Sequence, residues 1–151
     1  MYFTIVQLVK HWRGKIETKT DALIAFGAGL VGALTFAFTD SHWFNAVEAE
    51  VYAFSTFFTA IVVWLALLWS EKADEEGHER YILIIAYMIG LATGLHLLNL
   101  LTIPFVALLI YFRKFKFKWS SFGILVALTG LVFFIIHNVI IKGMPKIADA
   151  I

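Results

Sequence analysis

Four long stretches of the sequence are apolar and carry no charged residue, and they constrain the fold more than any other feature. They cover residues 22–39, 52–69, 81–112 and 120–141. At about 1.5 Å per residue, stretches of 18 to 22 residues match the roughly 30 Å hydrocarbon core of a bilayer. The chain is 61% hydrophobic and 15% charged, whereas soluble domains are about 25% charged. The sequence therefore predicts an all-α, polytopic membrane protein and excludes a basic domain that binds nucleic acid.

The third stretch is too long for a single span. Its 32 residues would make a helix of about 48 Å. Polar and helix-breaking residues gather in its middle, namely Thr93, Gly94, His96, Asn99, Thr102 and Pro104. Proline lacks a backbone donor and disfavours helix at the residue before it. We therefore expect two segments, about 81–95 and 104–112, which meet near residues 95–103, and about five membrane segments in total.

The distribution of Lys and Arg favours this broken version. If the N-terminus is cytoplasmic and residues 81–112 cross twice, ten of the 12 Lys and Arg residues are cytoplasmic; with one crossing, eight are. This predicts a cytoplasmic N-terminus and an external C-terminus. Residues 1–20 are expected to form a cytoplasmic or interfacial segment, and residues 21–151 a single transmembrane helical domain. The apolar residues 1–9 are too short to span, so they predict an interfacial helix or the end of a truncated span.

This topology places three polar groups on the external side. They are the loop 40–52 with carboxylates at Asp40, Glu48 and Glu50, the pair His96 and Asn99, and the pair His137 and Asn138. The loop contains no Lys or Arg. His96 and Asn99 share one face if their turn is helical. The chain has no cysteine, which excludes disulfides, thiolate zinc sites and thiol catalysis.

Each of these groups allows two interpretations. Glu48 and Glu50 can be acidic simply because external loops lack cations, or they can bind a divalent metal or a cationic group. His96 and Asn99 can satisfy the backbone at the break. Alternatively, they can serve function, because polar groups at membrane depth are costly and are often retained for chemistry.

Two further patterns concern packing and lipid. Gly29 with Ala25 and Ala33, and Gly90 with Gly94, form small-xxx-small pairs that are typical of helix contacts. Residues 113–118 interleave four cations with two phenylalanines, which predicts an interfacial turn attracted to anionic lipid headgroups.

Two motifs together resemble a known family. One is the run FTDSHWFNAVEAEVYA over residues 38–53, and the other is GLATGLHLLNLLTIP over residues 90–104. Both are similar to stretches of the bacterial membrane proteins of glycosyltransferase family 117, also catalogued as domain-of-unknown-function family 2723. Their eukaryotic relatives are protein O-mannosyltransferases. The resemblance covers about residues 20–148.

The resemblance implies a GT-C fold in the bacterial inner membrane. Such enzymes move a sugar from a polyprenyl-phosphate donor to a protein or envelope acceptor on the external face. Glu48 and Glu50 match the family motif EAEVY, which implies a role in binding a divalent metal or the donor phosphate. His96 and Asn99 match its G-x-H-x-x-N pattern, which implies contact with donor or acceptor. Asp40 matches less tightly, and His42 departs from the pattern, so it carries no role.

The resemblance also implies that this chain is an internal fragment. Family members are longer and begin with a span and an external acidic motif that holds the expected catalytic base, so we expect that base to lie outside this chain. The alternative is a non-enzymatic polytopic protein, such as a transporter segment or an assembly subunit, because a broken span with polar groups at depth is also typical of transporters.

Overall fold

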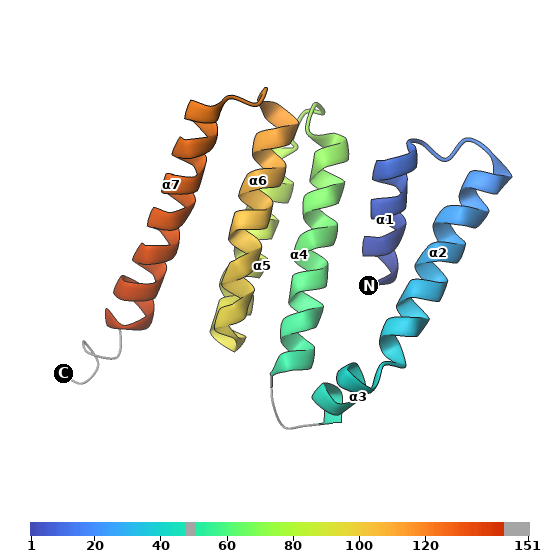
Figure 1. Cartoon of the computed structure of the whole chain (residues 1–151), viewed down its shortest axis with the longest axis horizontal. Coiled ribbons are helices and arrows are strands. Elements are labelled where there is room, and N and C mark those ends of the chain that lie inside the picture. Colours follow the sequence, from blue (N-terminus) through green and yellow to red (C-terminus); the bar gives the residue numbers. More distant parts are fainter. Residues whose placement is uncertain (48–50, 144–151) are drawn as a thin grey trace. The chain divides into compact units, whose positions relative to one another are not determined.

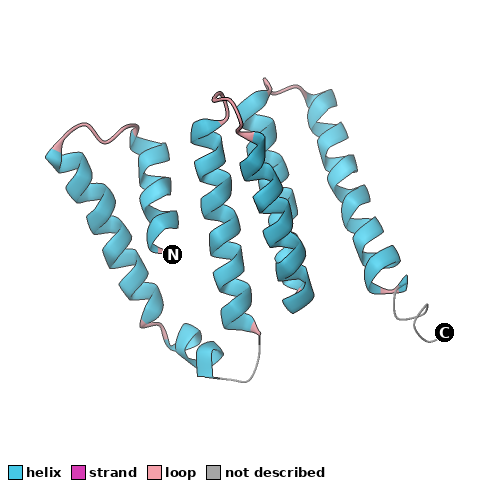
Figure 2. Cartoon of the chain, turned by 180° about the vertical axis from the view of Figure 1, so that it is seen from behind, coloured by secondary structure: helices cyan, strands magenta, loops and turns pink. Residues whose placement is uncertain are grey.

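The computed structural model describes residues 1–47 and 51–143, and in this part of the chain every regular element is helical (Figure 2). The chain forms two compact units, Met1–Thr102 and Ile103–Ile151. The predicted all-α fold is therefore confirmed. Glu48 and Glu50 lie outside the described residues.

The elements follow one another in this order: α1 (Tyr2–Arg13), α2 (Lys19–Ala37), α3 (Asp40–Val47), α4 (Tyr52–Lys72), α5 (Glu79–Leu95), the 3-10 helix η1 (Leu97–Leu101), α6 (Thr102–Lys114), α7 (Trp119–Ile135) and the π-helix η2 (Ile136–Ile141). Three described helical stretches are long and apolar enough to cross a membrane: Lys19–Ala37, Tyr52–Lys72 and Trp119–Asn138. The broken third stretch forms α5 and α6, which are shorter, at 17 and 13 residues.

In unit 1, α1 packs between α2 and α4 (Figure 1). Thr4 Oγ1 donates a hydrogen bond to the buried carbonyl of Ala60 in the middle of α4, at 3.2 Å. Gly29 in the middle of α2 lies against Val6 and Tyr2. The N-terminal half of α1 therefore sits beside the centres of two apolar helices. The division of the chain at residue 20 stays a prediction.

The glycines of the predicted small-residue pairs have different surroundings. A Cβ atom at Gly29 would come within 2.5 Å of Val6 Cγ2, so this glycine lets α1 and α2 approach closely. Apart from the backbone of their own helix, no atom of the described chain lies within 4 Å of a Cβ built at Gly90 or Gly94. The helix contact expected at Gly29 is confirmed, whereas a side chain at Gly90 or Gly94 would point into open space in the described chain.

Among the described helices of unit 1, α4 supplies the most buried side chains, including Val62, Ala66 and Trp69. Trp69 is 1% exposed, and its indole Nε1 donates to His78 Nδ1 at 3.3 Å. This bond joins the end of α4 to the residue that precedes α5. It ties the two helices together at the turn between them.

The two ends of unit 1 differ in their content of Lys and Arg. One end, formed by residues 10–19 and 71–80, carries Lys10, Arg13, Lys15, Lys19, Lys72 and Arg80 together with six Asp and Glu residues. We call it the basic end because it carries all the Lys and Arg residues of unit 1. The α3 end, formed by residues 38–47, 51–56 and 95–102, carries no Lys or Arg. Figure 1 shows α3 at the lower end of the unit, where α2 finishes and α4 begins. A hollow of about 680 Å³ at the basic end is lined by Lys10, His11, Lys15 and Glu71, among others.

Candidate functional site

The candidate site begins at the break between α5 and α6, where the sequence predicted it. α5 ends at Leu95, and His96 has an extended backbone with φ −153° and ψ 128°. Its N–H still donates to the Ala92 carbonyl at 2.9 Å, which closes the last turn of α5. Pro104 is the third residue of α6, in the first turn, where a helix does not need its N–H.

Asn99 holds this break against α4. It is 1% exposed, and its Nδ2 donates to the Ala92 carbonyl at 2.8 Å. Its Oδ1 accepts hydrogen bonds from Ser55 Oγ and Thr59 Oγ1, both at 3.0 Å. Both lone pairs of the amide oxygen are therefore in use. The side chain acts as a clamp between the end of α5 and the first turns of α4.

Sequence reasoning missed Ser55 and Thr59. The two hydroxyls are four positions apart, so they share one face of α4. Two hydroxyl residues at this spacing in an uncharged span could have indicated a polar contact on that face of the helix. Hydroxyls in a membrane helix seek a polar partner because the hydrocarbon offers none.

His96 lies beside the beginning of α4. Its ring centroid is 5.0 Å from that of Tyr52, the first residue of the helix. His96 belongs to the second motif of the sequence, and Tyr52 belongs to the first. The contact therefore brings the two motifs together through residues that are 44 positions apart along the chain.

Asp40 and His42 lie in α3 at the same end of unit 1. Asp40 is exposed in the first turn of this helix, where the helix dipole favours a carboxylate. The ring of His42 packs 4.4 Å from that of Phe36, which gives it a structural contact. His42, to which the resemblance assigns no role, therefore has a packing contact with Phe36.

The described residues contain no group of three or more His, Cys, Asp or Glu side chains that could hold a metal ion. The described part of the α3 end therefore does not fit a metal centre on its own. The predicted metal ligands, Glu48 and Glu50, lie outside the described residues, and their role stays a prediction.

His137 and Asn138 belong to unit 2, in η2. Asn138 Nδ2 donates to the Phe134 carbonyl at 3.0 Å, a local bond along the same helix. That the pair shares a membrane face with His96 stays a prediction.

Comparison with known families gives one match. The family model described as the protein O-mannosyl-transferase TMEM260 N-terminal domain matches residues 1–119. No curated protein and no solved structure matches the chain. The predicted relation to protein O-mannosyltransferases is thus confirmed, while the narrower assignment to glycosyltransferase family 117 stays a prediction. Since the match covers most of the sequence, this membrane chain belongs to the family of the protein O-mannosyl-transferase TMEM260 N-terminal domain.

Proposed function

We propose that the chain acts as a membrane glycosyltransferase that moves a sugar from a polyprenyl-phosphate donor to a protein or envelope acceptor. The observation that carries this proposal is the contact between His96 and Tyr52. It joins the two motifs on which the resemblance to family 117 and the GT-C enzymes is based. The two motifs meet at one end of α4, beside the break between α5 and α6. Polar groups at such a break in a membrane span are suited to binding a ligand.

In this proposal His96 contacts the donor phosphate. An imidazole can donate a hydrogen bond to a phosphate oxygen, and a protonated one adds a charge. The α3 end offers no competing Lys or Arg. Asn99 has its amide oxygen fully engaged with α4, so its role is to position the turn that carries His96.

Glu48 and Glu50 complete the proposal as ligands of a divalent metal or as groups that organise the donor phosphate. Glu50 precedes Tyr52 by two positions, so both carboxylates are close in sequence to the residue that touches His96. If a divalent metal is bound, it supplies charge stabilisation to the phosphate leaving group.

The proposal also includes an orientation in a bacterial inner membrane. The basic end of unit 1 faces the cytoplasm, and the α3 end faces outward, as the positive-inside rule favours. With this orientation the donor and the acceptor meet His96 on the external side.

The test measures transfer of radiolabelled mannose from a polyprenyl-phosphate mannose in membranes that contain the gene product with this chain. His96→Gln should lower transfer by about tenfold or more, as expected when a hydrogen bond to a charged group is lost. His42→Gln is the matched control, since it alters a histidine at the same end that has no assigned role, and it should keep activity within about twofold.

The carboxylates are tested in the same assay. Glu48→Gln and Glu50→Gln should each reduce transfer, whereas Glu75→Gln and Glu76→Gln at the basic end should leave it unchanged. Normal transfer by the Glu48, Glu50 and His96 variants at normal expression would remove all three residues from the site. Absence of any mannose transfer by the unsubstituted protein would favour the non-enzymatic alternative.

A further inference from the structure

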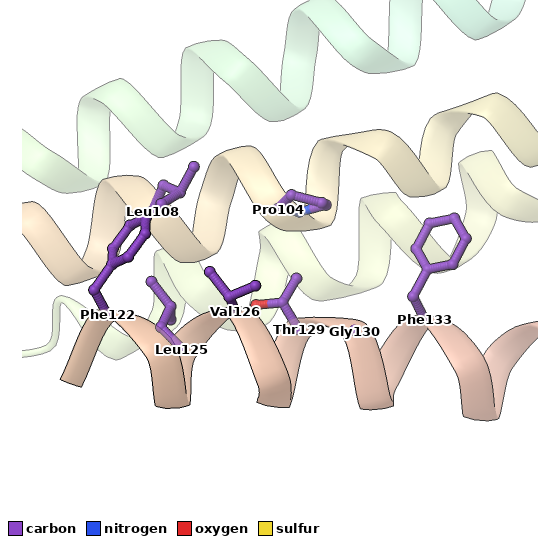
Figure 3. Close-up of a pocket in the computed structure, with 8 residues that line it drawn as sticks. All are labelled: Pro104, Leu108, Phe122, Leu125, Val126, Thr129, Gly130 and Phe133. Atoms are coloured by element: carbon purple, nitrogen blue, oxygen red, sulfur yellow. The ribbon is translucent and has the colours of Figure 1, made fainter. Parts of the chain in front are cut away.

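Unit 2 contains an apolar groove between α6 and α7. Its volume is about 320 Å³, and its lining includes Pro104 and Leu108 of α6 and Phe122, Thr129, Gly130 and Phe133 of α7. Figure 3 shows the α7 side chains turned toward α6 along the groove. Phe122 and Phe133 are 11 positions apart, a distance of about 17 Å along the helix. The groove is therefore about as long as one bilayer leaflet is deep, half of the roughly 30 Å core.

A basic turn lies at one end of this groove. The turn over residues 113–118 carries Arg113, Lys114, Lys116 and Lys118. Lys118 is bonded to a residue that lines the groove, because its carbonyl accepts a hydrogen bond from the Phe122 N–H at 2.9 Å. The sequence contains no Asp or Glu from residue 81 to residue 148. Unit 2 therefore concentrates positive charge at one end of the apolar groove.

The turn is fixed in place and has the composition of a membrane interface. Tyr111 OH accepts from the Lys118 N–H at 3.1 Å, which ties the end of α6 to the beginning of α7. Phe115, Phe117 and Trp119 around it are exposed, Trp119 by 79%. Exposed aromatic rings next to Lys and Arg are typical of the headgroup level of a bilayer.

We propose that this hairpin binds an anionic phospholipid. One acyl chain lies in the groove, and the phosphate lies on the basic turn, where Lys116 and Lys118 are exposed. The charge at this end of the groove favours an acidic headgroup over a zwitterionic one. The groove is apolar along its length, so it suits a hydrocarbon chain, whereas the turn suits the phosphate. The site uses unit 2 alone and does not depend on sugar transfer.

The test uses the purified full chain and native mass spectrometry with phosphatidylglycerol and phosphatidylcholine of the same acyl length. Phosphatidylglycerol should be retained about tenfold better, as two lysines near a headgroup allow. The double variant Lys116→Gln, Lys118→Gln should lose this preference. Equal retention of both lipids by the unsubstituted chain would overturn the proposal.

Two glycines of α7 provide a matched pair for the groove. No atom lies within 4 Å of a Cβ built at Gly130 or at Gly123, so neither position meets a neighbour in the described chain. Gly130 lines the groove and Gly123 does not. Gly130→Leu should reduce the amount of bound phosphatidylglycerol at least about fivefold, because the leucine fills the groove. Gly123→Leu should change this amount less than about twofold.

Helical content by circular dichroism checks that both leucine variants fold. Equal lipid retention by the two would overturn the proposal. So would conversion of a dimer to a monomer by Gly130→Leu without loss of lipid, since the groove would then be an interface with a second copy of the chain.

Discussion

At the scale of single residues, Asn99 shows how a membrane helix can be broken at low cost. Ending α5 in an apolar region frees backbone carbonyls that lipid cannot satisfy, each at a cost of several kcal/mol. The Asn99 amide nitrogen donates a second hydrogen bond to the Ala92 carbonyl, beside that of the His96 N–H, and its oxygen accepts from two hydroxyls of α4. One side chain thus links the end of α5 to α4.

Replacing Asn99 with alanine should destabilise unit 1. The change removes the acceptor of the Ser55 and Thr59 hydroxyls and one of the two hydrogen bonds to the Ala92 carbonyl, which keeps its bond from the His96 N–H. We expect a loss of about 1–3 kcal/mol in the free energy of unfolding. The loss stays modest because each hydroxyl can turn back to a carbonyl of its own helix. Reversible unfolding in mixed micelles measures it.

The matched control for this prediction is Asn138→Ala. Asn138 makes one local bond to Phe134 and is only partly covered, so its replacement should cost about 0.5 kcal/mol or less. Equal losses for Asn99→Ala and Asn138→Ala would contradict the role of Asn99 as a clamp.

The sequence predicted the break at residues 95–103 but not its partners. Pro104 and the excessive length of the stretch are local signals, and they located the break to within a few residues. The choice of Ser55 and Thr59 depends on which face of α4 meets η1. That choice follows from the packing of the whole unit, which one sequence does not encode in a local pattern.

At the scale of elements, α1 depends on small residues in its neighbour. The sequence left residues 1–9 as an interfacial helix or the end of a truncated span, and the structure shows a 12-residue helix that packs between α2 and α4. Gly29 in its small-xxx-small pattern indicated a helix contact in the sequence. The sequence did not identify α1 as the partner, because such a pattern indicates a close approach without identifying which helix approaches.

Gly29→Ala should loosen the contact between α1 and α2. The new Cβ would meet Val6 Cγ2 at 2.5 Å and the Tyr2 ring at 3.0 Å, so the helices must separate. We expect a loss of about 1–3 kcal/mol in the free energy of unfolding, the usual cost of overpacking. Faster hydrogen exchange of the α1 amides should accompany this loss.

Gly27→Ala is the control in the same helix. No atom lies within 4 Å of a Cβ at this position, so alanine should be neutral or stabilise α2 by up to about 1 kcal/mol. Adding Val6→Ala to Gly29→Ala removes the clashing methyl group and should restore part of the loss. If Gly29→Ala and Gly27→Ala behave alike, α1 does not pack on α2 as described.

At the scale of the whole molecule, the number of crossings determines which residues share a membrane face. Unit 1 has a basic end and an α3 end without Lys or Arg, which gives it a direction in the membrane. Along the chain, the basic turn at residues 113–118 follows α6, whereas the break that carries His96 precedes it. If α5 and α6 each cross, this turn lies on the same side as residues 73–78.

Labelling of single cysteines tests this topology, and the absence of native cysteine gives a clean background. Ser41→Cys, Glu76→Cys and Lys116→Cys all replace exposed residues. In intact cells a membrane-impermeant maleimide should label Ser41→Cys, whereas Glu76→Cys and Lys116→Cys should react only after permeabilisation. External labelling of Lys116→Cys with protection of Glu76→Cys would mean that α5 and α6 cross once together. The break at His96 would then lie inside a single folded span, and the external site proposed around it would have to be abandoned.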